Sequence, residues 1–161
     1  MENADRPSYE ELIARQGPSV YRLAFARLRR RADAEDVYQE VFLRYVEKGP
    51  VFEGPDHERA WFLRVTLNAC NSLWRAPWRR LAAPLTEELP FEDPEELGLH
   101  QELRKLPAKY RTVLHLYYWE GLPTEAIAQL VGCKPEAARQ RLTRARRMMK
   151  DLLAEEEWID V

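Results

Sequence analysis

A run of basic side chains lies near the C-terminal end of the chain, in the segment 132–147 with the sequence GCKPEAARQRLTRARR. It holds five arginines and one lysine, although the whole chain of 161 residues has a formal net charge of −2. Arginine can bond O6 and N7 of guanine together, glutamine can pair with the edge of adenine, and any cation can neutralise a phosphate. These residue types therefore indicate contact with nucleic acid.

Apolar residues recur in this run every three or four positions from Ala138 to Met149, which is the spacing of one buried helix face. A preceding helix expected over 124–131 and a turn at Gly132 complete the pattern of a helix-turn-helix. The expected second helix runs from 135 to about 153, with Arg146 at the flank of its outer face as a phosphate contact. The predicted DNA-contacting residues are Lys134, Glu136, Arg139, Gln140, Arg141, Thr143, Arg144 and Arg147. A solvated basic helix that forms only surface ion pairs is the alternative.

A second polar stripe lies on a helix expected over 58–74. Its members combine one ring, two amides and two cations at offsets of three or four residues: Trp61, Arg64, Asn68, Asn71 and Arg75. A ring can stack on an unpaired base, amides can bond base edges, and cations can hold phosphates. A polar helix face with a tryptophan packed at its edge would show the same residues, so both interpretations stay open.

An acidic stripe lies on a helix expected from Asp33, as its N-cap, to Gly49-Pro50. Asp36, Glu40 and Glu47 share one face of this helix with Leu43. An aliphatic side chain among acids suits docking onto a basic partner. Acids at a helix N-terminus also match the helix dipole, and the sequence does not decide between the two explanations.

Helical spacing continues along nearly the whole chain, and no stretch shows the sustained alternation of a strand. Further helices are expected over 9–30, where Gly17-Pro18 could interrupt the helix, over 97–105, and from Pro107 to Gly121. The predicted fold class is all-α.

The chain is expected to form two small helical domains joined by an acidic, proline-containing linker. Between 86 and 97 there are six acids and no base, and three prolines interrupt the surrounding segment. The predicted boundaries are 1–80 for the first domain, 81–97 for the linker and 98–161 for the second domain.

Catalytic and metal-binding patterns are missing from the sequence. His57, His100 and His115 are isolated, without the spacing of metal ligands, and His115 is expected to be a surface or boundary residue rather than a ligand. Cys70 and Cys133 are expected to be small buried thiols. No enzyme activity, metal or cofactor is therefore expected. Without a membrane-spanning run or a secretory leader, the chain is expected in the cytoplasm.

Several segments follow one another in the order of a known family. They are YEEL at 9–12, ADAEDVYQEVFLR at 32–44, AWFLRVTLN at 60–68 and LPAKYR at 106–111, followed by the helix-turn-helix. Together they cover nearly the whole chain and resemble the extracytoplasmic-function (group 4) sigma factors of the sigma-70 family. The segment 32–44 is the most specific of these matches.

The resemblance implies a non-enzymatic subunit that binds core RNA polymerase and recognises the −10 and −35 promoter elements. Its implied partners are promoter DNA, the clamp of the largest polymerase subunit, the flap of the second-largest subunit, and an anti-sigma factor. By the same resemblance, the residues that dock on the clamp are Asp36, Gln39, Glu40 and Leu43; the stripe from Trp61 to Arg75 would hold the −10 element. The helix-turn-helix would read the −35 element, where Glu136 and Thr143 depart from the family pattern.

Two other classes of protein would use part of the same pattern. A helix-turn-helix regulator that acts without being a polymerase subunit needs the basic helix but not the acidic stripe. A helical adaptor that binds only protein has no task for the basic helix.

Overall fold

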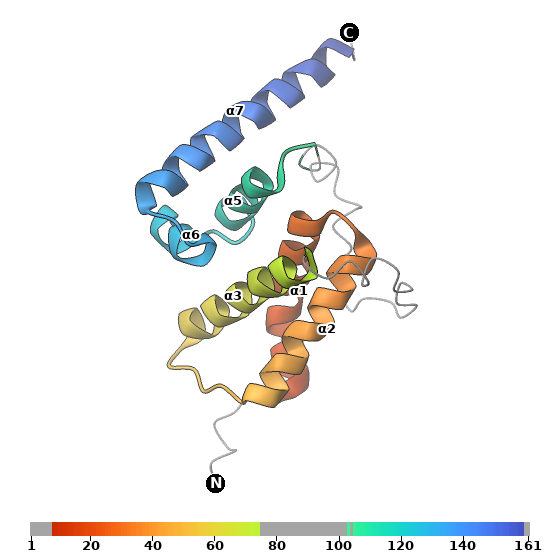
Figure 1. Cartoon of the computed structure of the whole chain (residues 1–161), viewed down its shortest axis with the longest axis vertical. Coiled ribbons are helices and arrows are strands. Elements are labelled where there is room, and N and C mark those ends of the chain that lie inside the picture. Colours follow the sequence, from red (N-terminus) through yellow and green to blue (C-terminus); the bar gives the residue numbers. More distant parts are fainter. Residues whose placement is uncertain (1–7, 75–102, 104, 160–161) are drawn as a thin grey trace.

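The computed structural model describes residues 8–74, 103 and 105–159, and every regular element within them is a helix. The six helices are α1 (Tyr9–Leu28), α2 (Arg31–Lys48), α3 (Pro55–Trp74), α5 (Ala108–Tyr118), α6 (Thr124–Val131) and α7 (Pro135–Ile159) (Figure 1). The predicted all-α class is confirmed. The expected linker 81–97, most of the expected helix 97–105, and Arg75 lie outside the described residues. None of the described helices combines the length and apolarity needed to cross a bilayer.

Helix α1 is continuous through Gly17-Pro18, where the sequence analysis allowed for an interruption. The Ser8 hydroxyl caps its start by accepting a bond from the Glu11 N–H (3.1 Å), and Arg29 ends it with φ 65°. A Cβ on Gly17 would lie 3.3 Å from the Tyr38 hydroxyl of α2. The glycine therefore allows close packing of α1 on α2.

Helix α2 begins two residues before the expected N-cap. Asp33 lies inside its first turn rather than at the cap, which Arg30 occupies. The carboxylate of Asp33 still lies at the positive end of the helix dipole, which explains why the sequence pattern resembled a cap. The C-terminal end is confirmed, because Gly49 adopts φ 55° and its N–H bonds the Tyr45 carbonyl.

The helix-turn-helix has the expected elements. Gly132 turns the chain with φ 76°, and Ala138, Leu142 and Ala145 are buried while Met149 is half-buried. Helix α7 extends to Ile159, beyond the expected end near 153, because neither glycine nor proline interrupts it there.

The N-terminal bundle (α1, α2 and α3) and the C-terminal bundle (α5, α6 and α7) pack against each other. Helix α5 contacts α1, and α6 contacts α3 (Figure 1). Leu23 of α1 and Leu63 and Leu67 of α3 belong to the same buried cluster as Leu116 and Ile127 of the C-terminal bundle. The described helices therefore form one body with a shared apolar interface.

Arg111 of α5 joins the two bundles by capping α1. Its side chain is buried, and Nε and Nη2 donate to the carbonyls of Ala26 (2.6 Å) and Arg27 (2.8 Å). Nη1 donates to the carbonyl of Leu106. The last carbonyls of a helix lack partners within it, so Arg111 supplies donors that α1 itself cannot provide. Burial, with the charges of Arg29 and Arg27, lowers the pKa of Arg111 to about 10.

Glu120, between α5 and α6, makes the second polar contact. Its carboxylate accepts bonds from Ser19 of α1 (2.9 Å) and Arg59 of α3 (3.0 Å), and lies 3.2 Å from His115 Nε2. Of the two places expected for His115, the surface was wrong, because the side chain is fully buried beneath this carboxylate, at the boundary between the two bundles. Burial alone would raise the pKa of Glu120, but the bond and charge of His115 and the bonds from Arg59 and Ser19 outweigh burial and lower the pKa to about 2.

Glu120→Gln tests this buried carboxylate through acid unfolding. Because its pKa falls from 4.5 to about 2 on folding, the charge stabilises the fold above pH 4.5, and the stabilisation is lost between pH 4.5 and 2. From pH 4.5 to pH 2, the free energy of unfolding should fall by about 2 kcal/mol less in the variant than in the wild type. The exposed Glu125→Gln should follow the wild type. If the free energy of unfolding depends on pH in the same way in Glu120→Gln and the wild type, the lowered pKa assigned to Glu120 is contradicted.

Candidate nucleic-acid interface

An open groove of about 630 Å³ runs along the outer face of α7 beside the start of α5. Five cations and no carboxylate line it. The lining residues are Lys109, Tyr110, Ala137, Arg139, Gln140, Arg141, Thr143, Arg144 and Arg147. Six of the eight side chains predicted in this face therefore meet at one surface, while Lys134 and Glu136 are exposed at the start of the helix. A concave surface with this charge suits a phosphate backbone.

Lys109 was missed by the sequence analysis. It lies in the first turn of α5 and reaches the groove from a different helix. Helical spacing on α7 could not identify it, because periodicity groups residues of one helix only. The lysine in LPAKYR was visible as a cation, but its place beside the groove depends on the packing of α5 on α7.

Two of the groove arginines contact polar groups of neighbouring helices. Arg144 bonds the Tyr110 phenol and thereby lowers the pKa of Tyr110. Arg139 lies 3.6 Å from the carboxylate of Glu125 on α6, with both side chains largely exposed. An exposed pair of this kind is weak, so the Arg139 guanidinium can exchange Glu125 for another anion at little cost.

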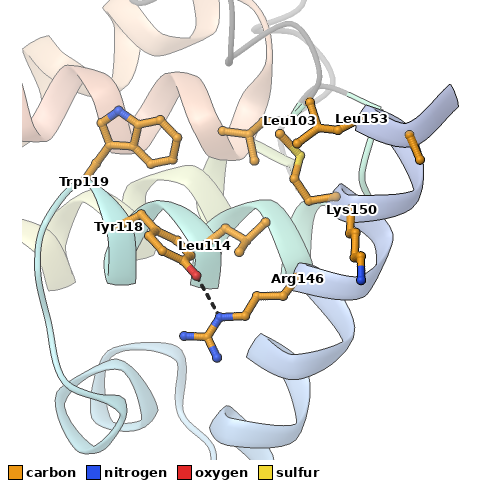
Figure 2. A pocket seen from close by; sticks show the side chains of 9 residues that line it. Leu103, Leu114, Tyr118, Trp119, Arg146, Lys150 and Leu153 are labelled. Atoms are coloured by element: carbon orange, nitrogen blue, oxygen red, sulfur yellow. Dashed lines mark hydrogen bonds between the residues drawn. The ribbon is translucent and has the colours of Figure 1, made fainter. Parts of the chain in front are cut away.

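Arg146 lies on the α5 side of α7, away from the groove. Its Nε donates to the Tyr118 hydroxyl (2.8 Å), and the guanidinium stands 4.8 Å from the centre of the Tyr117 ring. The bond to Tyr118 raises the pKa of Arg146. Figure 2 shows the arginine reaching Tyr118 across the space between the helices. Arg146 was predicted to contact a phosphate, but its guanidinium instead contacts two tyrosines of α5.

An apolar pocket of about 800 Å³ lies next to Arg146, between α5 and the second half of α7 (Figure 2). Its lining is mostly carbon, with two cations beside it: Leu103, Leu114, Tyr118, Trp119, Arg146, Met149, Lys150, Leu153 and Ala154. A pocket of this size and composition suits an apolar side chain or helix of a protein partner.

The polar stripe on α3 is exposed except at its tryptophan. Arg64, Asn68 and Asn71 are exposed, and the Asn71 amide oxygen accepts a long bond from Arg27 (3.4 Å). Trp61 is half-buried, with its ring centre 4.9 Å from that of Phe62. The tryptophan is packed at the edge of an aromatic cluster with Tyr45 and Phe52, as the structural interpretation of the stripe expected. Arg75 lies outside the described residues.

The acidic stripe on α2 presents two aliphatic side chains to solvent. Leu43 is 54% exposed and Val46, which the sequence analysis missed, is 61% exposed. Gln39 is exposed, while Asp36 and Glu40 are half-buried, and Glu40 pairs with Arg44 at 3.3 Å. Val46 could have been found because it lies three residues after Leu43. The stripe is therefore an apolar patch bordered by acids.

The two cysteines are free thiols in different surroundings. Cys70 is fully buried, and burial raises its pKa to about 12, whereas Cys133 is half-buried. Among the described residues, no three His, Cys, Asp or Glu side chains gather as ligands for a metal ion.

Each of the two bundles matches a model of a known protein family. Residues 12–80 match the model of sigma-70 region 2, and residues 97–149 match that of sigma-70 region 4. The chain therefore belongs to the sigma-70 family, and its all-helical fold with a helix-turn-helix agrees with that class.

Similar individual proteins identify the group within the sigma-70 family to which this chain belongs. The ECF RNA polymerase sigma factor SigE of Mycolicibacterium smegmatis is 30% identical over 166 residues, which cover 95% of this chain and 64% of SigE. The sigma factor SigV of Bacillus subtilis is 27% identical over 143 residues, with 85% of this chain and 86% of SigV covered. The chain is a member of the extracytoplasmic-function (ECF) group.

Solved structures agree with this fold. CnrH, in complex with the cytosolic domain of CnrY, matches with a TM-score of 0.65 and 26% identity over 91% of this chain and 88% of CnrH. The sigma factor RpoE of Bartonella quintana, in complex with the anti-sigma factor NepR, matches with a TM-score of 0.71 and 20% identity over 91% of this chain and 96% of RpoE. The second likeness concerns the fold alone.

Arg147 and Arg146 form a matched pair of variants, because the same charge is removed at neighbouring positions. Arg147→Gln should reduce the slope of log affinity against log salt by about 0.9 for duplex DNA, since it removes one phosphate contact. Arg146→Gln should leave the slope unchanged, because Tyr118 and Tyr117 hold that side chain away from the groove. Fluorescence anisotropy over a series of salt concentrations measures both slopes. Equal slopes in the two variants would contradict the placement of the groove.

Proposed function

We propose that this chain acts as a promoter-recognising, non-catalytic subunit of RNA polymerase. The observation that carries the proposal is the coexistence of a basic groove on α7 and an acid-bordered apolar patch on α2 in a chain of the sigma-70 family. A helix-turn-helix regulator that acts alone needs only the groove, so the family membership and the patch favour the polymerase subunit.

Each part of the chain has a role in this proposal. Residues 1–80 bind core polymerase and the −10 element, 81–97 form the linker, and 98–161 bind the −35 element. The family matches at 12–80 and 97–149 support this division. The groove residues with Lys134 and Glu136 read the −35 element, and Trp61, Arg64, Asn68, Asn71 and Arg75 hold the −10 element.

The clamp of the largest polymerase subunit is the proposed partner of α2. Asp36, Gln39, Glu40 and Leu43 provide the docking surface, and the exposed Val46 extends its apolar centre. An apolar anchor surrounded by charge suits a basic partner, since burial of the anchor supplies affinity and the acids supply orientation.

The apolar pocket between α5 and α7 is the proposed docking site for the flap of the second-largest polymerase subunit. Its carbon-rich lining can bury an apolar side chain, and Arg146 and Lys150 can pair with acids at its edge. An anti-sigma factor is a further proposed partner, because CnrH and RpoE were each solved with a partner protein.

Promoter binding requires the two bundles to separate. Helix α3 packs against α6, and α6 packs against α7. Two helix-to-helix steps of 8–10 Å separate the axes of α3 and α7 by at most about 20 Å. Asn71 of the candidate −10 face and Arg141 of the candidate −35 face even line the same cavity of about 110 Å³. The names −10 and −35 give positions in base pairs, so the two elements lie about 25 base pairs apart, which is about 85 Å of duplex. A duplex of this length resists bending. The packed form therefore cannot hold both elements, and the polymerase-bound form is open.

Leu43→Asp tests the docking surface. The substitution places a charge at the centre of the apolar patch without touching the core, because Leu43 is 54% exposed. We expect binding to core polymerase to weaken at least tenfold in a pull-down or anisotropy titration, while the circular dichroism spectrum is unchanged. Val51→Asp is the control, since Val51 is 76% exposed on a loop outside the stripe. Unchanged polymerase binding by the Leu43 variant would overturn the assignment.

Run-off transcription tests the function as a whole. Core polymerase is incubated with a pool of genomic fragments, with and without the chain, and the transcript starts are sequenced. New starts that depend on the chain and share two upstream motifs are expected. DNA binding without any chain-dependent start would favour the regulator that acts without polymerase.

A further inference from the structure

A small polar cavity lies between the two bundles, next to the groove on the outer face of α7, with which it shares Lys109 and Arg141. Its volume is about 110 Å³, and Arg27 of α1, Asn71 of α3, Lys109 and Thr112 of α5, and Arg141 of α7 line it together with three aliphatic residues. Three cations thus converge from three helices. Both bundles contribute to the lining, so the cavity exists only when they are packed.

The positive charge in this cavity is not balanced within the described part of the chain. No carboxylate lines the cavity, and no described Asp or Glu forms an ion pair with its three cations. The polar contact of Arg27 is the neutral Asn71, and Lys109 stands 5.0 Å from the centre of the Tyr110 ring. Like charges gathered in this way oppose packing unless an anion joins them.

The size of the cavity limits which anion it can take. At about 30 Å³ per water, 110 Å³ holds roughly three or four waters, which is room for one tetrahedral oxyanion. Arginine presents a planar fork that suits phosphate, and lysine adds a point charge. The Thr112 hydroxyl donates to the Ala108 carbonyl (2.7 Å), so toward the cavity it can accept the proton of a hydrogen phosphate.

We propose that this cavity binds a phosphate group that bridges the two bundles and stabilises their packed arrangement. A ligand that binds only the packed form stabilises it by RT ln(1 + [L]/Kd), where [L] is the free ligand concentration. Lys109 and Arg141 line both this cavity and the α7 groove, so a bound phosphate competes with DNA for these two side chains. Only this competition depends on the proposed promoter function; the site itself does not.

Thermal unfolding of the full chain in inorganic phosphate tests the site, with sodium chloride at equal ionic strength as reference. Saturating phosphate should raise the Tm of the wild type by about 2–4 °C. Arg27→Gln and Lys109→Gln should remove most of this rise. Arg30→Gln is the matched control, because it removes one exposed arginine outside the cavity. An equal rise in the Arg27, Lys109 and Arg30 variants would overturn the proposal.

A DNA backbone is the other source of the same phosphate chemistry, and a second measurement distinguishes the two. A short duplex without promoter motifs is titrated against the same variants at constant salt. If DNA is the source, free phosphate leaves the Tm unchanged, and Arg27→Gln loses two- to tenfold in duplex affinity while Arg30→Gln does not. If neither phosphate nor duplex distinguishes Arg27→Gln from Arg30→Gln, the cavity binds no phosphate. Neither measurement uses polymerase, so this failure is separate from failure of the promoter role.

Discussion

The buried contacts of Arg111 and Glu120 with the N-terminal bundle determine how the rest of the molecule is arranged. Arg111 supplies donors to the last carbonyls of α1, and Glu120 joins Ser19 and Arg59 across the same interface. Leu23, Leu63 and Leu67 belong to the same buried cluster as Leu116 and Ile127 and add apolar packing to the interface. The position of the α7 groove relative to α3 therefore follows from a few buried charges together with apolar packing.

An interface built in this way can also open. Separating the bundles returns Arg111, Arg59 and Glu120 to water, so part of the lost bonding is recovered by hydration. A purely apolar interface would gain no such hydration on separation, so its whole contribution to the stability of the packed arrangement would be lost. Interfaces between domains of one chain commonly have this mixed character, which permits relative motion. The buried polar contacts thus specify the packed arrangement, while the acid-bordered patch on α2 and the pocket beside α7 stay exposed for partners.

Local signals predicted the local structure well. The glycines at 49 and 132 ended helices as expected, and the stripe that starts at Ala138 is buried. Long-range contacts were not predictable, because periodicity identifies a buried face but not the helix that covers it. His115 shows this limit: nothing near it in the sequence indicates that Glu120 and Arg59 meet above it. Arg146 shows the same limit, since its tyrosine partners belong to another helix.

The separation of the two bundles is the central claim, and the distance between two spin labels tests it most directly. Cysteines at Val51 and Asp151, in a chain with Cys133 replaced by serine, place one label on each bundle; both positions are exposed. Double electron–electron resonance should give one narrow distance for the free chain and a distance tens of ångströms longer in the complex with core polymerase and promoter DNA. The same distance in both samples, with transcription intact, would contradict the account.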